Sequence, residues 1–483
     1  MMRSMIAAAA PPPLPTSALA LGLDAFVTVR AAIASGIAES RATFEYSLAP
    51  SSLDVGYFVF AGLDPLLDAL ERYKTKSDDL SWLASVGAID EATRHLLGGV
   101  RFACDVDAAP EGSIVFPNET SLTVEGPFWQ AQLVAGMIEG ALAHSTLVAT
   151  RFARMVTAGG DAEIVESGAA TMYRLGGSPM LSRAAFIGGA GATTCAIAGK
   201  RYGIPVRATQ PESLDLASTD RAATMRAWLG AAPRGAVLRI DGAEAIGNAI
   251  AAIHERMRDP SWADPRVALS IHAEDRAELA TQALSAFAAA QLPEPLVIAS
   301  GVVDERTLLE LRRERVPIRA YFVNAHVAAD ASALARYELV AIEDNGAWSP
   351  RMRVGDSAAA SSDPGRKLLF RYASAEGAPV ADIAHLSSER MIRAKDGRFI
   401  DRASGFNERL QDATQSAPLL TNVMRNGKRV AATEPTRALR DRAEKALALL
   451  PEKHRRLVSP TKYPVGMTTA LAALKASLLE PSE

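Results

Sequence analysis

Short apolar runs alternate with amphipathic segments through the middle of the chain, between Glu163 and Glu343. The apolar runs have the length of buried strands, and the segments between them carry apolar residues at helical spacing. Seven strands are predicted, at Glu163–Ser167, Pro205–Thr209, Ala236–Asp241, Arg266–Ile271, Pro295–Ser300, Pro317–Val323 and Tyr337–Glu343. Four helices are predicted between them, at Asp220–Leu229, Ala243–Arg258, Asp275–Ala288 and Asp304–Arg313. This order indicates parallel strands joined by right-handed crossovers, which can close into an α/β barrel whose working residues follow the strand ends.

The flanking regions show a different pattern, with short β-rich runs separated by turn residues and by few helices. They predict an α+β sandwich formed by residues 19–126 together with 360–483, and they leave 127–359 for the barrel. Residues 1–18 are expected to be a disordered leader, because the apolar run Met5–Ala10 is shorter than a secretory core.

Further predictions concern four other segments of the chain. An apolar helix is expected from Phe128 to Thr157 as a hinge, and Phe186–Ala198 is expected to be a helix with closely packed glycines. Ala347–Pro364 lacks periodicity and predicts a long loop. Glu389–Ile392 is expected to add a short strand.

Composition narrows the classes of function. Among 483 residues, 48% are hydrophobic and 22% charged, which is typical of a soluble globular chain of two or three domains. A net charge of −3 gives no basic field for nucleic acid or a membrane surface, and neither partner is expected. The two cysteines, Cys104 and Cys195, give no disulfide framework, which favours a reducing cytoplasm.

Several stretches, in order along about residues 20–375, together resemble the nicotinate phosphoribosyltransferase family. They are Ala42–Tyr46 with Val59–Leu63, Val115–Glu119, Val124–Pro127 with Ala131–Leu133, Arg183–Gly189, Ala198–Lys200 with Gly203–Val206, Tyr337–Val340 and Pro364–Lys367. The resemblance implies the type II phosphoribosyltransferase fold, an irregular α/β barrel with an N- and C-terminal sandwich, and a homodimer. It also implies synthesis of nicotinate mononucleotide from nicotinate and phosphoribosyl pyrophosphate (PRPP), with ATP and Mg²⁺.

The family's catalytic motifs are altered in this chain. Where the family has two arginines after Glu166 and Gly168, this chain has Ala170 and Thr171. The position of the family's phosphorylated histidine, in the stretch that contains Thr209, holds Glu212.

The later motifs depart as well. The family motif R-x-D-S-G-D, which binds ribose and magnesium, corresponds to Ser270, His272, Ala273, Glu274 and Asp275. The motif that begins Ala299-Ser300 continues with Gly301-Val302-Val303, and the glycine-rich phosphate loop becomes Tyr321-Phe322-Val323-Asn324-Ala325. PRPP needs arginine or lysine forks, open backbone N–H groups and carboxylate-bound magnesium. Bulky residues in the loop and an acid at 212 therefore predict weak PRPP binding.

The strand ends nevertheless carry polar candidates, and a solvated rim without a ligand is the alternative. Candidate catalytic residues are Glu212, His272 and Asp275; candidate substrate-binding residues are Glu166, Gly168, Arg174, Thr209, Asp241, Ser300 and Asn324; candidate metal ligands are Asp275, His272 and His326. The surviving basic residues nearest these positions are Arg174, Arg207, Arg239 and Arg319. If they converged on the pocket, a retained reaction would be favoured.

Three hypotheses follow for function. The first is a family member whose reaction is lost or altered, acting as a repurposed enzyme or as a non-catalytic partner of another protein. The second is a functional nicotinate phosphoribosyltransferase with rearranged site residues. The third is a binding module that senses a pyridine or nucleotide as a small-molecule ligand. The sequence leaves the cofactor unknown, although the family would use ATP and Mg²⁺.

Overall fold

The computed structural model describes residues 21–49, 55–168, 174–232, 236–259, 262, 267–301, 304–324, 335–356, 360–395 and 397–480. These residues form two compact units. The first unit lies within Arg151–Asp330, and the second combines the described residues up to Thr150 with those from Ala335 onward. The division therefore falls within one long helix and before a strand, rather than at Pro127 and after residue 359 as the sequence suggested.

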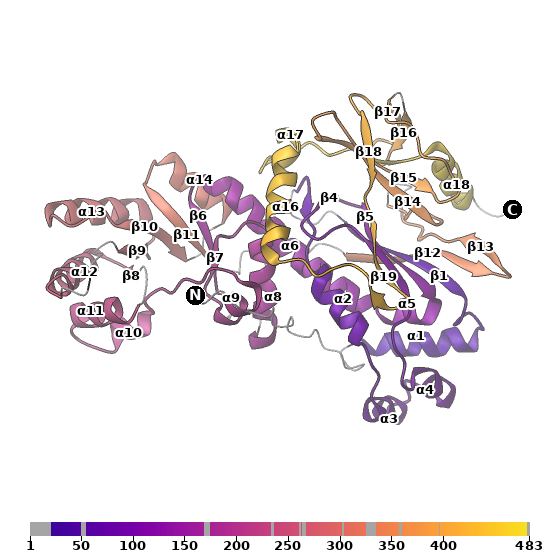
Figure 1. Ribbon diagram of the computed structural model, residues 1–483, viewed down its shortest axis with the longest axis horizontal. Coiled ribbons are helices and arrows are strands. Elements are labelled where there is room, and N and C mark those ends of the chain that lie inside the picture. Colours follow the sequence, from indigo (N-terminus) through magenta and orange to yellow (C-terminus); the bar gives the residue numbers. More distant parts are fainter. Residues whose placement is uncertain are drawn as a thin grey trace, which may run out of the picture. The chain divides into compact units, whose positions relative to one another are not determined.

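The first unit is built on a six-stranded parallel sheet of order β7-β6-β11-β10-β9-β8 (Figure 1). Its strands are β6 (Glu163–Ser167), β7 (Ala192–Thr193), β8 (Val237–Ile240), β9 (Ala268–Ile271), β10 (Leu296–Gly301) and β11 (Ile318–Asn324). Its helices are α8 (Arg174–Ile187), α9 (Ala196–Tyr202), α10 (Glu212–Leu216), α11 (Arg221–Ala231), α12 (Ala243–Arg256), α13 (Arg276–Ala289) and α14 (Glu305–Arg313).

The two edges of this sheet are connected through the segment between α9 and α10. Val206 forms a parallel bridge with Thr193 of β7, and Thr209 forms one with Val237 of β8. The predicted strand Pro205–Thr209 is thus reduced to single bridges, one to each edge strand of the sheet. The alternation of parallel strands and helices is the one that the sequence predicted, and closure into a barrel stays a prediction.

Alternation along the strands separates two apolar layers. Leu238, Leu269 and Val297 pack with helices α11, α12 and α13 in one core, and these helices lie along the strands in Figure 1. The neighbouring residues Val237, Ala268 and Ile298 point to the opposite face and form a second apolar cluster, which also includes Phe322 from β11. Because successive side chains of a strand point to opposite faces, the residue two positions further along each strand continues this second layer.

Two predictions for the barrel were wrong. The segment Phe186–Ala198 is not one helix: α8 ends at Ile187, glycines form a turn, and the short strand β7 follows. The turn includes Gly189 at φ +107°, a conformation that side-chain-bearing residues rarely adopt. The seventh predicted strand, Tyr337–Glu343, belongs to β12 of the second unit, where it pairs antiparallel with β1.

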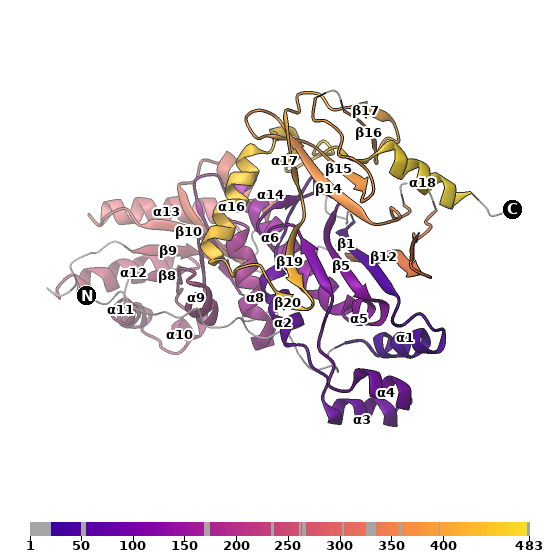
Figure 2. The same ribbon diagram turned by 45° about the vertical axis from the view of Figure 1, so that its right-hand side comes forward.

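The second unit contains two larger antiparallel or mixed sheets (Figure 2). The first, of order β13-β12-β1-β5-β3-β19-β20, comprises β1 (Arg41–Leu48), β3 (Asp105–Ala108), β5 (Thr120–Pro127), β12 (Ala335–Asp344), β13 (Ala347–Pro350), β19 (Thr421–Arg425) and β20 (Lys428–Arg429). The second, of order β17-β16-β21-β15-β14-β18, comprises β14 (Lys367–Ala373), β15 (Pro379–Leu386), β16 (Arg398–Asp401), β17 (Asn407–Arg409), β18 (Gln415–Pro418) and β21 (Val465–Met467). A two-stranded pair joins β2 (Phe58–Val59) and β4 (Ile114–Val115).

Helices complete the second unit and the connection to the first. They are α1 (Leu23–Ala34), α2 (Leu63–Arg72), α3 (Ser77–Ser85), α4 (Glu91–Leu97), α5 (Phe128–Leu133), α6 (Ala135–Gly159), α16 (Thr436–Leu449), α17 (Glu452–Arg455) and α18 (Thr469–Leu479). The expected hinge helix is therefore two helices, α5 and α6, with Val134 between them. The expected loop Ala347–Pro364 starts with strand β13, and Glu389–Ile392 forms no strand.

A buried cluster of charges links the two larger sheets of the second unit. Lys367 on β14 pairs with Glu45 on β1 at 3.0 Å between Nζ and Oε1, and both side chains are at most 8% exposed. Asp363 accepts from Lys475 Nζ at 2.8 Å and also pairs with Arg402. Burial alone would raise the pKa of Asp363, but Arg402, Lys475 and Lys367 outweigh it and lower that pKa to about 2.

Substitution of Asp363 by Asn should destabilise the protein by about 3–5 kcal/mol, because it leaves buried Lys475 and Arg402 without a counter-charge. Urea unfolding followed by circular dichroism measures this loss. Asp441→Asn is the matched control: Asp441 pairs with Arg437 on the exposed face of α16, and its loss should cost no more than about 0.5 kcal/mol. Equal effects of the two substitutions would contradict the account of the buried cluster.

Candidate active site at the carboxyl ends of the parallel strands

A polar layer follows the inner apolar cluster of the parallel sheet. Arg239 lies two residues after Val237, Ser270 two after Ala268, and Ser300 two after Ile298, so the alternation of the strands gives all three the same face. Arg239 and Ser270 are register partners on β8 and β9. In parallel α/β sheets, ligands bind at the carboxyl ends of the strands, and this layer occupies that edge.

A chain of hydrogen bonds runs through this layer. Arg239 Nη1 lies 3.2 Å from His272 Nδ1, and His272 Nε2 lies 2.9 Å from Ser270 Oγ. Ser270 Oγ in turn lies 2.5 Å from Ser300 Oγ. Arg276, in the first turn of α13, donates from Nε to the carbonyl oxygen of Ser300 at 3.2 Å.

Arg239 determines the tautomer of His272. A guanidinium can only donate, so Nδ1 of the imidazole accepts and the proton of the neutral ring is on Nε2, which donates to Ser270. Burial, and then the positive charge of Arg239, lower the pKa of His272 to about 4. His272 is therefore a neutral donor whose two nitrogens are both engaged, which makes it a poor general base toward Ser270 and leaves no lone pair for a metal.

Three carboxylates surround the arginines of this edge. Arg239 Nη2 lies 3.6 Å from Glu212 Oε1, and Arg239 Nε lies 3.6 Å from Asp241 Oδ2. Arg221 bridges two further oxygens, Asp241 Oδ1 at 2.8 Å and Asp215 Oδ2 at 3.1 Å. The guanidinium of Arg239 is mostly buried, whereas the side chain of Glu212 is 63% exposed.

The pKa values of these acids follow from their partners. Burial would raise the pKa of Asp241, but hydrogen bonding and charge from Arg221 outweigh burial and lower that pKa. Asp215 is more enclosed, and burial raises its pKa despite Arg221. Asp241 is therefore held as a carboxylate beside Arg239.

Glu166, a predicted substrate-binding residue, lies on the other side of its strand from inner-face Val165. It is fully buried and accepts from Ser182 Oγ at 2.8 Å and Thr193 Oγ1 at 2.6 Å. These hydrogen bonds connect β6 to α8 and to β7, so the role that they indicate for Glu166 is to hold these elements together.

The remaining predicted residues have different surroundings. Gly168 directly follows β6 at φ +99°, and Thr209 forms the bridge to β8. Asp275 is the N-cap of α13, where its Oδ1 accepts from the backbone N–H of Glu278 at 2.8 Å. His326, Ala170 and Thr171 lie outside the described residues, as do the side chains of Arg174 and Asn324.

Of the four arginines that the sequence named, Arg239 is placed at the site. Arg207 pairs with Glu163 at the start of β6, and Arg319 is exposed near the amino end of β11. The sequence named Arg239 among the nearest surviving basic residues but placed it within a strand rather than in a loop. Its alternation with Val237 was the signal that could have assigned it to the inner face. Arg221 and Arg276 were missed, and only their positions in the first turns of helices that follow the strand ends could have suggested them.

The site does not fit the Mg²⁺ that the family would use. In the part of the chain that the structure describes, no group of three His, Cys, Asp or Glu side chains is arranged to hold a metal ion. The R-x-D-S-G-D motif has two acids. In this chain the first is replaced by His272, whose two nitrogens already form hydrogen bonds, and the second, Asp275, caps helix α13.

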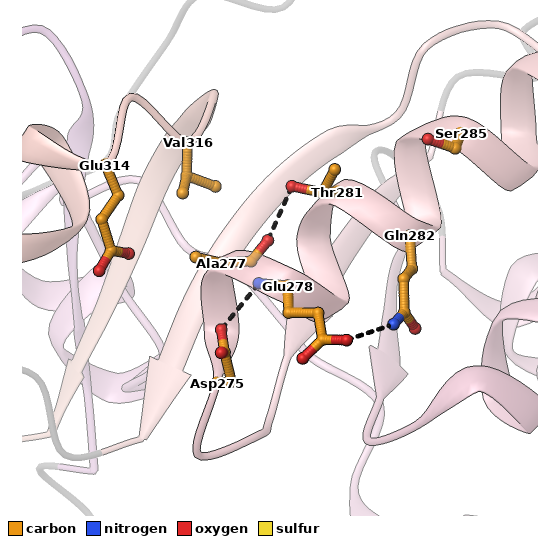
Figure 3. A pocket seen from close by; sticks show the side chains of 8 residues that line it. All are labelled: Asp275, Ala277, Glu278, Thr281, Gln282, Ser285, Glu314 and Val316. Carbon is orange, nitrogen blue, oxygen red and sulfur yellow. Dashed lines mark hydrogen bonds between the residues drawn. The ribbon is translucent and has the colours of Figure 1, made fainter.

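A separate open depression of about 700 Å³ lies on the outside of the first unit (Figure 3). It is lined by α13 and by Glu314 and Val316, which precede β11. The polar groups of α13 bond within the helix: Thr281 Oγ1 donates to the Ala277 carbonyl, and Gln282 donates to Glu278. The lining includes three acids and no basic residue, so it offers nothing to an anionic substrate.

Comparisons with known proteins agree with this architecture. Family models of the nicotinate phosphoribosyltransferase N-terminal domain and C-terminal domain match residues 25–138 and 366–475. A Bacillus subtilis nicotinate phosphoribosyltransferase is 26% identical over 90% of this chain and 89% of its own length. A Mycobacterium tuberculosis relative of the same description is 28% identical over 87% of this chain and 85% of its own length.

The solved structure of human nicotinic acid phosphoribosyltransferase matches with a TM-score of 0.79 at 22% identity, covering 95% of this chain and 99% of that one. The barrel and sandwich units thus define a protein of the phosphoribosyltransferase fold. With both terminal domain models matched and these relatives aligned over most of their length, the chain is similar to nicotinate phosphoribosyltransferases. Among the described residues, no helix is long and apolar enough to cross a membrane.

The lowered pKa of His272 predicts a pH dependence of stability. Its folded pKa of about 4 lies below the usual 6.5, so the unfolded state binds more protons between these values. Stability should therefore fall as pH drops from 6.5 to 4, by less than about 1.4 kcal/mol per pH unit from this one proton. His272→Asn should flatten the dependence in urea unfolding at several pH values.

His254→Asn provides the control, because His254 is exposed near the end of α12 and makes no part of this cluster. It should leave the pH slope unchanged. If His272→Asn and His254→Asn showed the same slope as the wild type, the neutral, hydrogen-bonded state of His272 would be refuted.

Proposed function

We propose that this chain is a nicotinate phosphoribosyltransferase-like protein of pyridine nucleotide metabolism in which the family reaction is lost or altered. The observation that carries the proposal is the engagement of Arg239 by His272, Glu212 and Asp241. A guanidinium in this position could hold a phosphate, but here it is already surrounded by carboxylates. The domain matches support the metabolic setting.

Two chemical requirements of the family reaction also lack their expected residues. The phosphorylated histidine is replaced by Glu212, whose carboxylate cannot form a phosphohistidine. The first acid of the motif that binds ribose and magnesium is replaced by His272, which is neutral and engaged, and the second is retained as Asp275. Lost charged contacts are worth roughly 1.5–3 kcal/mol each, so two such losses correspond to about 10²–10⁴-fold in rate.

A second candidate is a retained reaction with rearranged residues, and one observation favours it. The resemblance expects an arginine at position 270, and Arg239 is the register partner of Ser270 on the neighbouring strand. The polar layer that contains position 270 therefore still contains one guanidinium group, that of Arg239. In this alternative, Arg239→Gln would abolish an activity that the wild type possesses.

The turnover assay separates the two candidates. Wild-type protein with nicotinate, PRPP, ATP and Mg²⁺ should form nicotinate mononucleotide at least about 10²-fold more slowly than an active family member assayed in parallel, because several charged contacts are missing. Chromatographic detection of the mononucleotide measures this. Formation at the rate of the active relative, with loss in Arg239→Gln, would refute the proposal and establish the second candidate.

The proposal also includes a cytoplasmic homodimer that takes a small-molecule ligand. The family resemblance supports the dimer, and a chain with two cysteines, Cys104 and Cys195, both buried, fits a reducing compartment. Light scattering of the purified chain tests the dimer, and a monomer would remove that part of the proposal.

A further inference from the structure

Among the described residues at the carboxyl edge of the parallel sheet, carboxylates outnumber guanidinium groups. Three guanidinium groups, Arg221, Arg239 and Arg276, are countered by three carboxylates, Asp215, Asp241 and Glu212. The loop after β9 adds Glu274 and Asp275, and His272 contributes no charge at neutral pH. This edge therefore offers no net positive charge to a ligand.

Few basic residues follow the neighbouring strands; the first after β6 is Arg174, whose side chain lies outside the described residues. Residues 169–173, 302–303 and 325–334 directly follow β6, β10 and β11, and these stretches contain neither arginine nor lysine. Among the described residues, Arg239 is the cation at the centre of this polar layer, and the groups beside its guanidinium affect which ligands the site accepts.

Glu212 is the partner of Arg239 that is best placed to act on a ligand. It begins the short helix α10, its side chain is 63% exposed, and its Oε1 lies 3.6 Å from Arg239 Nη2. Asp241 is shared with Arg221, whereas Glu212 forms its ion pair with Arg239. An anionic ligand that approached Arg239 would therefore meet the carboxylate of Glu212 first.

We propose that Glu212 is a specificity-determining residue that neutralises Arg239, so that the site accepts a pyridine compound without net negative charge and excludes diphosphates. The ligand class is a pyridine nucleoside rather than a phosphorylated ribose. This inference rests on the proposed function, from which we take a pyridine compound as the ligand. The charge balance of the site is the reason to expect a ligand without a phosphate group. Like charges brought together at a binding site suppress the wrong partner, which is the effect assigned to Glu212.

The Glu212–Arg239 pair contributes little to folding. Ion pairs with an exposed partner contribute about 0–1 kcal/mol, so replacement of Glu212 should leave the protein folded. The substitution can therefore test ligand selection without loss of the fold.

The first experiment is calorimetric titration of the full chain with inorganic pyrophosphate. Glu212→Gln should bind pyrophosphate at least about tenfold more tightly than the wild type, since it frees one side of Arg239. Glu244→Gln is the matched control, because Glu244 is exposed in the first turn of α12 and makes the same change of charge. Glu212→Ala serves as a second variant, and thermal unfolding verifies the fold of each protein.

An unchanged pyrophosphate affinity in both Glu212 variants would overturn the inference. So would a gain in pyrophosphate affinity in Glu244→Gln equal to that in Glu212→Gln. The latter would show that net charge, rather than this pair, controls binding.

The second experiment compares two ligands that differ by one phosphate. Wild-type protein should bind nicotinate riboside, a zwitterion, at least about tenfold more tightly than nicotinate mononucleotide, and Glu212→Gln should narrow that ratio. Absence of nucleoside binding, or equal or tighter binding of the mononucleotide, would overturn the inference. The proposed function fails separately, by rapid mononucleotide formation from PRPP.

Discussion

The alternation of side chains along neighbouring parallel strands is the constraint on which this site depends. It assigns one residue of each strand to the inner face just above the apolar layer of Val237, Ala268 and Ile298. The residues so placed are Arg239, Ser270 and Ser300, and no loop rearrangement can exchange them for others. Because the same strands carry the outer core against α11 to α13, the fold and the chemistry of the site share one framework.

Arg239 organises the polar groups around that layer. It fixes the tautomer of His272, keeps the imidazole neutral and brings the carboxylates of Glu212 and Asp241 to within 3.6 Å of its nitrogens. The family resemblance places an arginine at position 270, and in this chain Arg239 is the register partner of that position. A cation is retained, but the carboxylates of Glu212 and Asp241 lie beside it, so its charge is already balanced within the protein.

The sequence predicted the repeating pattern well and its exceptions poorly. Strands β6 and β8 to β11 and helices α11 to α14 were predicted close to their observed bounds, because period-2 and period-3.6 patterns are strong over such lengths. Strand β7 has two residues and gives no such pattern, and β12 resembled a barrel strand although it pairs with β1. Glu212, Asp241, His272 and Ser300 were identified as candidates, but the pairing of Arg239 and the tautomer of His272 depend on contacts between strands that one sequence does not reveal.

The central claim is that Arg239 is committed to internal partners and is not available to a diphosphate. Calorimetric titration of the wild-type chain with PRPP and Mg²⁺ tests it most directly, since PRPP combines the diphosphate with the metal for which the described residues provide no cluster. The account predicts no saturable binding up to millimolar PRPP. Micromolar binding that is lost in Arg239→Gln would contradict it, because the guanidinium would then have exchanged Glu212 and Asp241 for the ligand.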